Sequence, residues 1–143
     1  MKPLPQRTQS GTEGNEINHV THGIIGAAMK VHSALGPGLL ESAYEACLMH
    51  ELRKAGFDVK SQVALPVVYD GVRIDLRYRL DLIVNDTVIV ELKCVDRILP
   101  IHEAQIISYL KLSGKNVGLI INFHVRQLKD GIRRFVEGQG KFR

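Results

Sequence analysis

The chain begins with a polar stretch and continues with hydrophobic residues at helical spacing. Residues 1–16 show no apolar period and contain two prolines and two glycines, which predicts a loose N-terminal tail. Apolar residues recur every three or four positions over 17–35 and again over 40–55. Each series ends at a glycine, Gly36 or Gly56, which is a common helix stop. We therefore expect two consecutive helices.

The next part of the chain has the alternation of β-strands. Residues 57–84 alternate and are rich in β-branched side chains, and the pair Asp70-Gly71 within them predicts a two-residue hairpin turn. A second turn at Asn85–Thr87 leads into a further strand over 88–95. We expect three antiparallel strands from this region.

A helix, a strand and a short helix are expected to complete the fold. Pro100 suits the first turn of a helix that runs to Gly114, and the apolar run 116–123 is typical of a strand covered on both faces. Residues 128–137 predict a short closing helix, and 138–143 form a polar tail. The order α, α, β, β, β, α, β, α predicts an α+β fold whose mixed sheet is flanked by helices. The length of 143 residues suits a single domain, which we place at 17–137.

The two strands that flank the second turn carry charged residues at positions where burial is expected. Only a three-residue loop at Asn85–Thr87 puts the apolar residues of both strands on one face of the sheet. In that register Asp81 lies directly across from Glu91, with Cβ atoms about 5 Å apart. Lys93 shares their face because side chains alternate along a strand.

Two facing carboxylates repel each other unless a cation neutralises them. A hard divalent ion such as Mg²⁺ or Mn²⁺ takes oxygen ligands and keeps positions open for phosphate oxygens. Lys93 beside it would orient a water or stabilise charge on a phosphate. The alternative is an exposed sheet face on which Arg79 and Lys93 form salt bridges with Asp81 and Glu91.

Three further residues carry candidate chemistry. Glu41 stands in the first turn of the second helix, where it would approach the site or only complement the helix dipole. Gln105 and Tyr109 lie four residues apart and so share a helix face. They would bind the phosphate backbone of a nucleic acid, or alternatively form the polar edge of a core helix.

The segments GLLESAY, QVALPVVYDGVRID, YRLDLIV, VIVELKCVD, HEAQIISYLKLSG and VGLIINF together resemble the GxxExxY protein family over residues 17–136. That family is similar to the PD-(D/E)xK nuclease superfamily, with a restriction-endonuclease-like core, and in particular to its RecB-like branch with a Q-x₃-Y motif. The implied core is a helix, a three-stranded antiparallel meander, a helix and a strand, here with an extra N-terminal helix. The proline that precedes the motif aspartate in the superfamily is absent, since this chain reads RLD.

The resemblance assigns a role to each candidate residue. Asp81 corresponds to the motif aspartate and Glu91 and Lys93 to the E-x-K element, while Gln105 and Tyr109 correspond to Q-x₃-Y. Glu41 corresponds to the acidic residue of the first core helix. The implied Mg²⁺ or Mn²⁺ ligands are Asp81, Glu91, the Leu92 carbonyl and Glu41.

The resulting hypothesis is a metal-dependent nuclease that hydrolyses phosphodiester bonds, with DNA the favoured substrate. The alternative is a catalytically silent module that binds nucleic acid or serves in assembly through a basic C-terminal segment, whose charges would otherwise form a solvated helix face. The basic residues concerned are Arg126, Lys129, Arg133, Arg134, Lys141 and Arg143.

Composition adds limited information. The net charge of +4 and pI near 9.2 suit a polyanionic partner without establishing one. Cys47 and Cys94 are expected to be small buried residues, and His32 and His102 to be structural. No zinc-like spacing or glycine-rich phosphate loop is present in the sequence. No apolar run suits a membrane span, so we expect a soluble cytoplasmic protein, either a monomer or a homodimer.

Overall fold

The computed structural model describes residues 4–75, 78–138 and 141–142. Three helices and eight strands follow one another there, with one short 3₁₀ helix near the end. In chain order they are α1 (Leu4–Leu35), α2 (Glu41–Lys54), β1 (Val59–Ala64), β2 (Val67–Tyr69), β3 (Val72–Ile74), β4 (Arg79–Val84), β5 (Val88–Lys93), α3 (Pro100–Ser113), β6 (Val117–Asn122), η1 (Leu128–Gly131), β7 (Ile132–Val136) and β8 (Lys141–Phe142).

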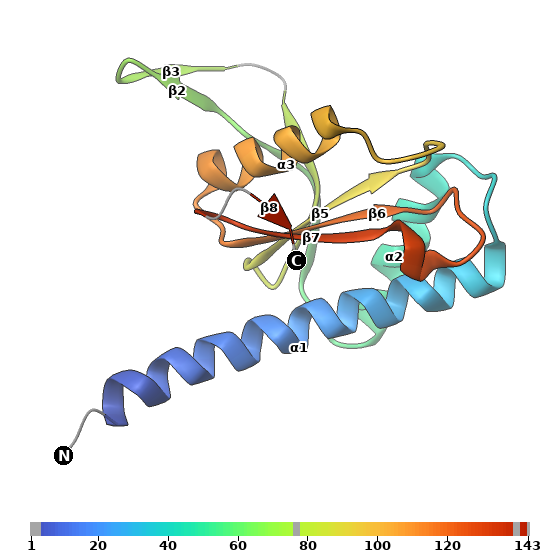
Figure 1. The fold of residues 1–143 in the computed structure, drawn as a ribbon, viewed down its shortest axis with the longest axis horizontal. Coiled ribbons are helices and arrows are strands. Elements are labelled where there is room, and N and C mark those ends of the chain that lie inside the picture. The colour runs from blue at the N-terminus through green and yellow to red at the C-terminus, as the bar shows by residue number, and fades with distance from the viewer. Residues whose placement is uncertain (1–3, 76–77, 139–140, 143) are drawn as a thin grey trace.

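The main sheet has the strand order β1-β4-β5-β6-β7-β8. β5 and β6 are parallel and are joined by the crossover helix α3, whereas the other neighbours are antiparallel. The predicted α+β mixed sheet is therefore confirmed, and β1, β4 and β5 form its three-stranded antiparallel meander. The hairpin at Asp70-Gly71 also forms, but β2 and β3 make a separate small sheet that projects from the body (Figure 1).

Helices cover both faces of the main sheet. α1 and α3 lie on opposite sides of it (Figure 1). The larger core cluster joins α1 and α2 to one face of the sheet, and the smaller one joins α3 to the other. On β4 and β5, the side facing α1 and α2 carries five of the six apolar residues expected on one face, namely Leu82, Val84, Val88, Val90 and Leu92. The sixth, Leu80, belongs instead to the smaller cluster on the α3 side.

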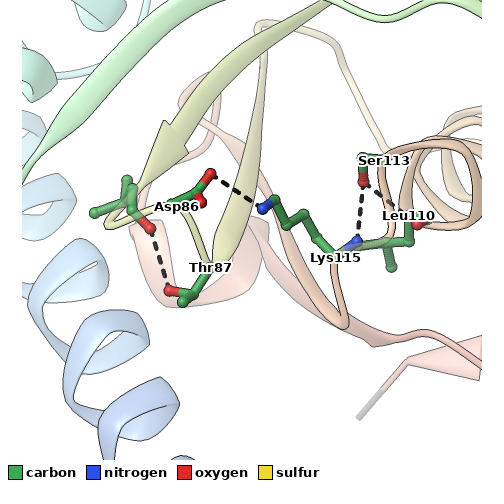
Figure 2. Close-up of polar contacts among 6 residues, drawn as sticks. Asp86, Thr87, Leu110, Ser113 and Lys115 are labelled. Carbon is green, nitrogen blue, oxygen red and sulfur yellow. Dashed lines mark hydrogen bonds and ion pairs between the residues drawn. The ribbon is translucent and has the colours of Figure 1, made fainter.

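The β4–β5 turn has the predicted length. Val84 pairs with Val88 across Asn85–Thr87, and two of the loop residues, Asn85 and Asp86, have positive φ. Thr87 Oγ1 donates to the Val84 carbonyl at 3.2 Å, and Lys115 Nζ donates to Asp86 Oδ1 at 3.0 Å (Figure 2). The ion pair ties the turn to the loop between α3 and β6, at the opposite end of the hairpin from Asp81.

The N-terminal prediction is wrong from Leu4 onward, because α1 begins there rather than after residue 16. Pro5 stands in the first turn, where its missing N–H costs nothing, and no further proline follows until Pro37. Among the described residues, none of the helices combines the length and apolar character needed to span a membrane.

The predicted closing helix over 128–137 is also wrong, since η1 and the strand β7 occupy it. β7 pairs with β6 and supplies hydrogen-bond partners for a strand edge that would otherwise be bare. Part of the predicted polar tail, Lys141–Phe142, forms β8 against β7. The basic residues expected on one helix face are instead spread over a bend (Arg126), η1 (Lys129), β7 (Arg133 and Arg134) and β8 (Lys141), while Arg143 lies outside the described residues. Arg133 forms an ion pair with Glu103 at 2.8 Å.

Candidate active site

The strands β4 and β5 stop pairing through their backbones where the charged residues begin. Regular pairing ends at Leu82 and Val90. One residue further, the Asp81 backbone N–H donates to Glu91 Oε2 at 3.0 Å, and the Leu92 N–H donates to Asp81 Oδ2 at 2.9 Å. Two carboxylates thus replace the next rungs of the ladder. The predicted register, with Asp81 across from Glu91, agrees with this arrangement.

The backbone of β5 turns one carbonyl toward the same gap. Within a strand the N–H and C=O of one residue point to the same side. The Leu92 N–H points toward Asp81, so its carbonyl also lies on the β4 side. The Lys93 carbonyl points the other way and accepts the Phe123 N–H at 2.9 Å.

Glu91 is buried among negative charges. The residue is only 5% exposed to solvent. Burial raises the pKa of Glu91 to about 8, with the carboxylates of Asp81 and Glu41 adding to the effect and the Asp81 N–H and Lys93 opposing it. Without a bound cation, Glu91 therefore keeps its proton at neutral pH.

Lys93 and Gln105 come together from different elements. Lys93 ends β5, and its Nζ donates to Gln105 Oε1 on α3 at 3.4 Å. Tyr109, one turn further along α3, is buried, and burial raises its pKa with Glu91 the next largest contributor. The structure thus brings both α3 candidates to the two strands.

A short turn before α2 sets the position of Glu41. Tyr44 is fully buried and stacks on Phe123 at a centroid distance of 4.5 Å. Its hydroxyl donates to the Gly36 carbonyl and accepts the Leu39 N–H at 3.1 Å. The turn is held from within the core, and α2 begins directly after it at Glu41. Glu41 is exposed at the rim of the site and close enough to raise the pKa of Glu91.

Glu45, a residue that sequence reasoning missed, belongs to this acidic group. It is half-buried, and both its oxygens accept from Gln62 Nε2, at 3.1 and 3.3 Å. Burial raises the pKa of Glu45, and Asp81 and Glu41 add to the effect. The spacing of four residues from Glu41 is the signal that would have placed it on the same helix face.

Gln62 lies on β1 across from Asp81. Its φ is 51°, a left-handed conformation that is uncommon for residues other than glycine. The pairs Ser61↔Leu82 and Val63↔Leu80 flank the position, but Gln62 itself is not paired. Both neighbours of β4 therefore depart from regular pairing next to Asp81.

Asn122 is a second residue that sequence reasoning missed. It is 2% exposed and pairs with Lys93 in the parallel ladder. Its side chain accepts the Val95 N–H at 3.1 Å and the His124 N–H at 3.2 Å, and donates to the Val95 carbonyl at 2.9 Å. It therefore fixes the chain directly after Lys93. An amide inside the otherwise apolar run 116–123 was the available signal.

The two histidines considered from the sequence have structural roles. His32 Nε2 lies 2.8 Å from the Val125 carbonyl, an acceptor, so this nitrogen carries the proton. His102 Nδ1 accepts the Leu99 N–H at 3.0 Å at the start of α3.

The donor atoms suit a hard divalent cation. Across the described residues, no three Asp, Glu, His or Cys side chains form a ready-made metal cluster. Asp81 and Glu91 each use one carboxylate oxygen on a backbone amide, which leaves the other as a donor. With the Leu92 carbonyl these are oxygen ligands of the kind that Mg²⁺ and Mn²⁺ prefer. A cation there would also oppose the burial and the repulsion from Asp81 that together raise the pKa of Glu91.

The mixed sheet and the helices on its two faces have the arrangement of a nuclease-type domain. A family profile described as the PD-(D/E)XK nuclease superfamily matches residues 18–135. The chain therefore belongs to the PD-(D/E)XK nuclease superfamily. No curated protein and no solved structure matched the chain in the other two comparisons.

Proposed function

We propose that the protein is a divalent-metal-dependent nuclease that hydrolyses phosphodiester bonds of nucleic acid, with DNA the favoured substrate. The observation that carries the proposal is the convergence of Asp81, Glu91 and Lys93 where β4 and β5 separate. An intact acid pair beside an amine is what phosphodiester hydrolysis requires and what a silent binding module has no need to keep.

Asp81, Glu91, the Leu92 carbonyl and Glu41 would hold Mg²⁺ or Mn²⁺. Such an ion, when bound, neutralises the acids and polarises the phosphate. Asp81 and Glu91 are already oriented, because each accepts a backbone N–H from the opposite strand. Less side-chain freedom is therefore lost on binding.

Lys93 would act on the reacting phosphate. Its ammonium is held by the Gln105 oxygen and can orient the attacking water and donate to a phosphate oxygen on which charge develops. With its oxygen occupied, Gln105 offers its amide N–H groups to the nucleic-acid backbone, as Tyr109 offers its hydroxyl. Attack of water on phosphorus breaks the bond to one sugar oxygen and leaves a phosphate monoester and a hydroxyl.

Within the superfamily we infer a place in the GxxExxY group. The structure supports a physical reason for that spacing. Gly38 has φ 105° in the turn, Tyr44 holds the turn from the core, and Glu41 between them emerges at the site.

The decisive test is Lys93→Ala. Wild-type protein should cleave labelled DNA or RNA with Mg²⁺ or Mn²⁺, and we expect the variant to lose at least about 100-fold in rate while keeping its circular dichroism and melting temperature. Lys54→Ala, an exposed lysine at the end of α2, is the matched control and should cleave normally. The proposal fails if the wild type cleaves no nucleic acid, or if Lys93→Ala cleaves equally well.

Metal binding can be tested without turnover. Mn²⁺ should raise the melting temperature of the wild type in a concentration-dependent way, because an ion that binds only the folded state stabilises it. Asp81→Asn should weaken that response. A wild type that shows no response to divalent ions would favour the binding-module alternative.

A further inference from the structure

A groove lies beside the candidate active site on the outer side of α3. It has a volume of about 270 Å³ and is lined by Tyr78, Ile101, Gln105, Ser108, Tyr109 and Leu112. The α3 residues among these recur at intervals of three and four, so they form one face of the helix.

The groove is bordered by large apolar side chains that remain exposed. Tyr78 is 46% exposed, Ile101 68% and Leu112 39%. Tyr78 immediately precedes β4, and its carbonyl accepts the Leu65 N–H at 2.9 Å, which fixes its backbone. Its ring packs at a tilt against that of Tyr109, with centroids 6.4 Å apart. A fixed aromatic ring with an exposed surface is a suitable stacking partner for another flat ring.

The groove shares two residues with the candidate site. Gln105 lines it and also binds the Lys93 ammonium. Tyr109 lines it as well, and it belongs to the same core cluster as Ile89, two residues before Glu91 on β5. A nucleic-acid strand whose phosphate lies at Lys93 would therefore have an adjoining nucleotide at the groove.

The chemistry of the lining favours a base over a phosphate. None of the six lining residues is a lysine, arginine, aspartate or glutamate, so the groove offers no charge to a phosphate. It offers instead an aromatic surface and aliphatic walls, with the Gln105 amide and Ser108 hydroxyl as hydrogen-bond partners. Its volume lies just below the range of pockets that hold drug-sized ligands, which suits a single nucleotide.

We propose that this groove binds an unpaired nucleobase, stacked on Tyr78, of a strand whose phosphate lies at Lys93, so that the enzyme acts on single-stranded or unpaired nucleic acid. The inference rests on the proposed function and names its substrate class. A base inside a duplex is stacked between its neighbours and cannot reach Tyr78, whereas an unpaired base can.

The chain contains no tryptophan, which permits a direct test. Tyr78→Trp introduces a single tryptophan at the groove, which can be excited selectively at wavelengths that tyrosine does not absorb, and stacking of a base on it should quench its emission. We expect saturable quenching by a twelve-nucleotide oligothymidylate, or by the corresponding oligouridylate, with Ca²⁺ as the divalent ion. A blunt duplex and an abasic chain of equal length should not quench it. Met29→Trp, on α1 beyond the sheet, is the matched control and should not respond.

Binding of the same probes to Tyr78→Ala gives an independent measurement. Fluorescence anisotropy should show oligothymidylate binding weakened about fivefold or more relative to wild type, the loss expected for removing a stacking partner. Binding of the abasic chain should be unchanged. Tyr78→Phe, which retains the ring, should bind both probes as the wild type does.

Several outcomes would overturn the inference. They are equal quenching by duplex and single strand, equal loss of affinity for the abasic chain, or quenching of the Met29→Trp control. Another is emission from Tyr78→Trp that changes with protein concentration alone together with a dimer in light scattering, because a second copy would then cover the groove. If cleavage depends on Lys93 but no base quenches the tryptophan, base binding in the groove is refuted and the proposed nuclease activity stands. If bases quench the tryptophan but no nucleic acid is cleaved, the nuclease activity is refuted and base binding stands.

Discussion

Replacing Glu91 with glutamine probes the charge balance on which the site depends. Glutamine has the same shape, cannot ionise, and keeps an oxygen to accept the Asp81 N–H. Burial beside Asp81 and Glu41 raises the pKa of Glu91 to about 8 from an ordinary value of 4.5. A difference of that size corresponds to a ceiling of about 5 kcal/mol in the free energy of unfolding.

The sign of the effect follows from where the proton is held. Below about pH 4.5, Glu91 is protonated in the folded and unfolded states alike, and its titration costs no stability. As pH rises toward 8, the unfolded chain releases the proton while the folded protein retains it, so the wild type loses stability across this window. Glu91→Gln lacks that loss. The free energy of unfolding of Glu91→Gln should exceed that of the wild type by about 2 kcal/mol at pH 6, and this difference should reach its maximum above pH 8.

Urea unfolding in EDTA at pH 5, 6, 7 and 8 measures the advantage directly. Groups common to both proteins cancel in the difference between their free energies of unfolding. Glu51→Gln is the control, since Lys30 and Lys54 outweigh desolvation and lower the pKa of Glu51, so its removal should not reproduce the gain. A constant difference between wild type and Glu91→Gln from pH 5 to pH 8 would refute the reasoning.

Three further changes test the scaffold of the site. Asn122→Ala leaves the Val95 N–H and C=O and the His124 N–H without their side-chain partner and should cost about 2–4 kcal/mol of unfolding free energy in urea, against about 0.5 kcal/mol or less for the exposed Asn116→Ala. Equal losses would remove Asn122 from its positioning role. Tyr44→Phe keeps the ring stacked on Phe123 but loses both hydroxyl bonds; it should cost about 1–2 kcal/mol and slow cleavage, whereas the exposed Tyr69→Phe should do neither. Gly131→Ala would place a Cβ in steric overlap with the Asn122 carbonyl oxygen and should lower the melting temperature, whereas Gly26→Ala, in open space on α1, should raise it by adding about 0.5–1 kcal/mol of stability. A Gly131→Ala variant as stable as wild type would show that η1 can move away from β6.

The separation of β4 and β5 explains how a sheet interior can hold charge. Burying a carboxylate without hydrogen-bond partners would cost too much free energy for the fold to remain stable. Asp81 and Glu91 avoid this cost in part, because each accepts a backbone N–H that would otherwise bond to a carbonyl of the neighbouring strand. The strands satisfy their amides with side chains and keep a gap between them. The remaining cost of burial shows in the pKa of Glu91, which is raised to about 8.

The sequence alone determined the elements whose patterns are local. α2, α3 and the β4–β5 hairpin lie close to their predicted places, because hydrophobic period, glycine stops and loop length are read over a few residues. The same local rules set the register that puts Asp81 across from Glu91, since only one loop length buries both apolar faces.

The tertiary structure decided what depends on residues far apart in the chain. Residues 128–137 carry apolar positions compatible with a helix, but the need of β6 for a partner makes half of them, Ile132–Val136, a strand. Glu45 is bonded by Gln62, which comes from another element 17 residues further along the chain. Asn122 clamps Val95 across 27 residues of sequence. Burial and hydrogen bonding between distant segments depend on how elements pack together, and a hydrophobic period read along one segment does not contain that information.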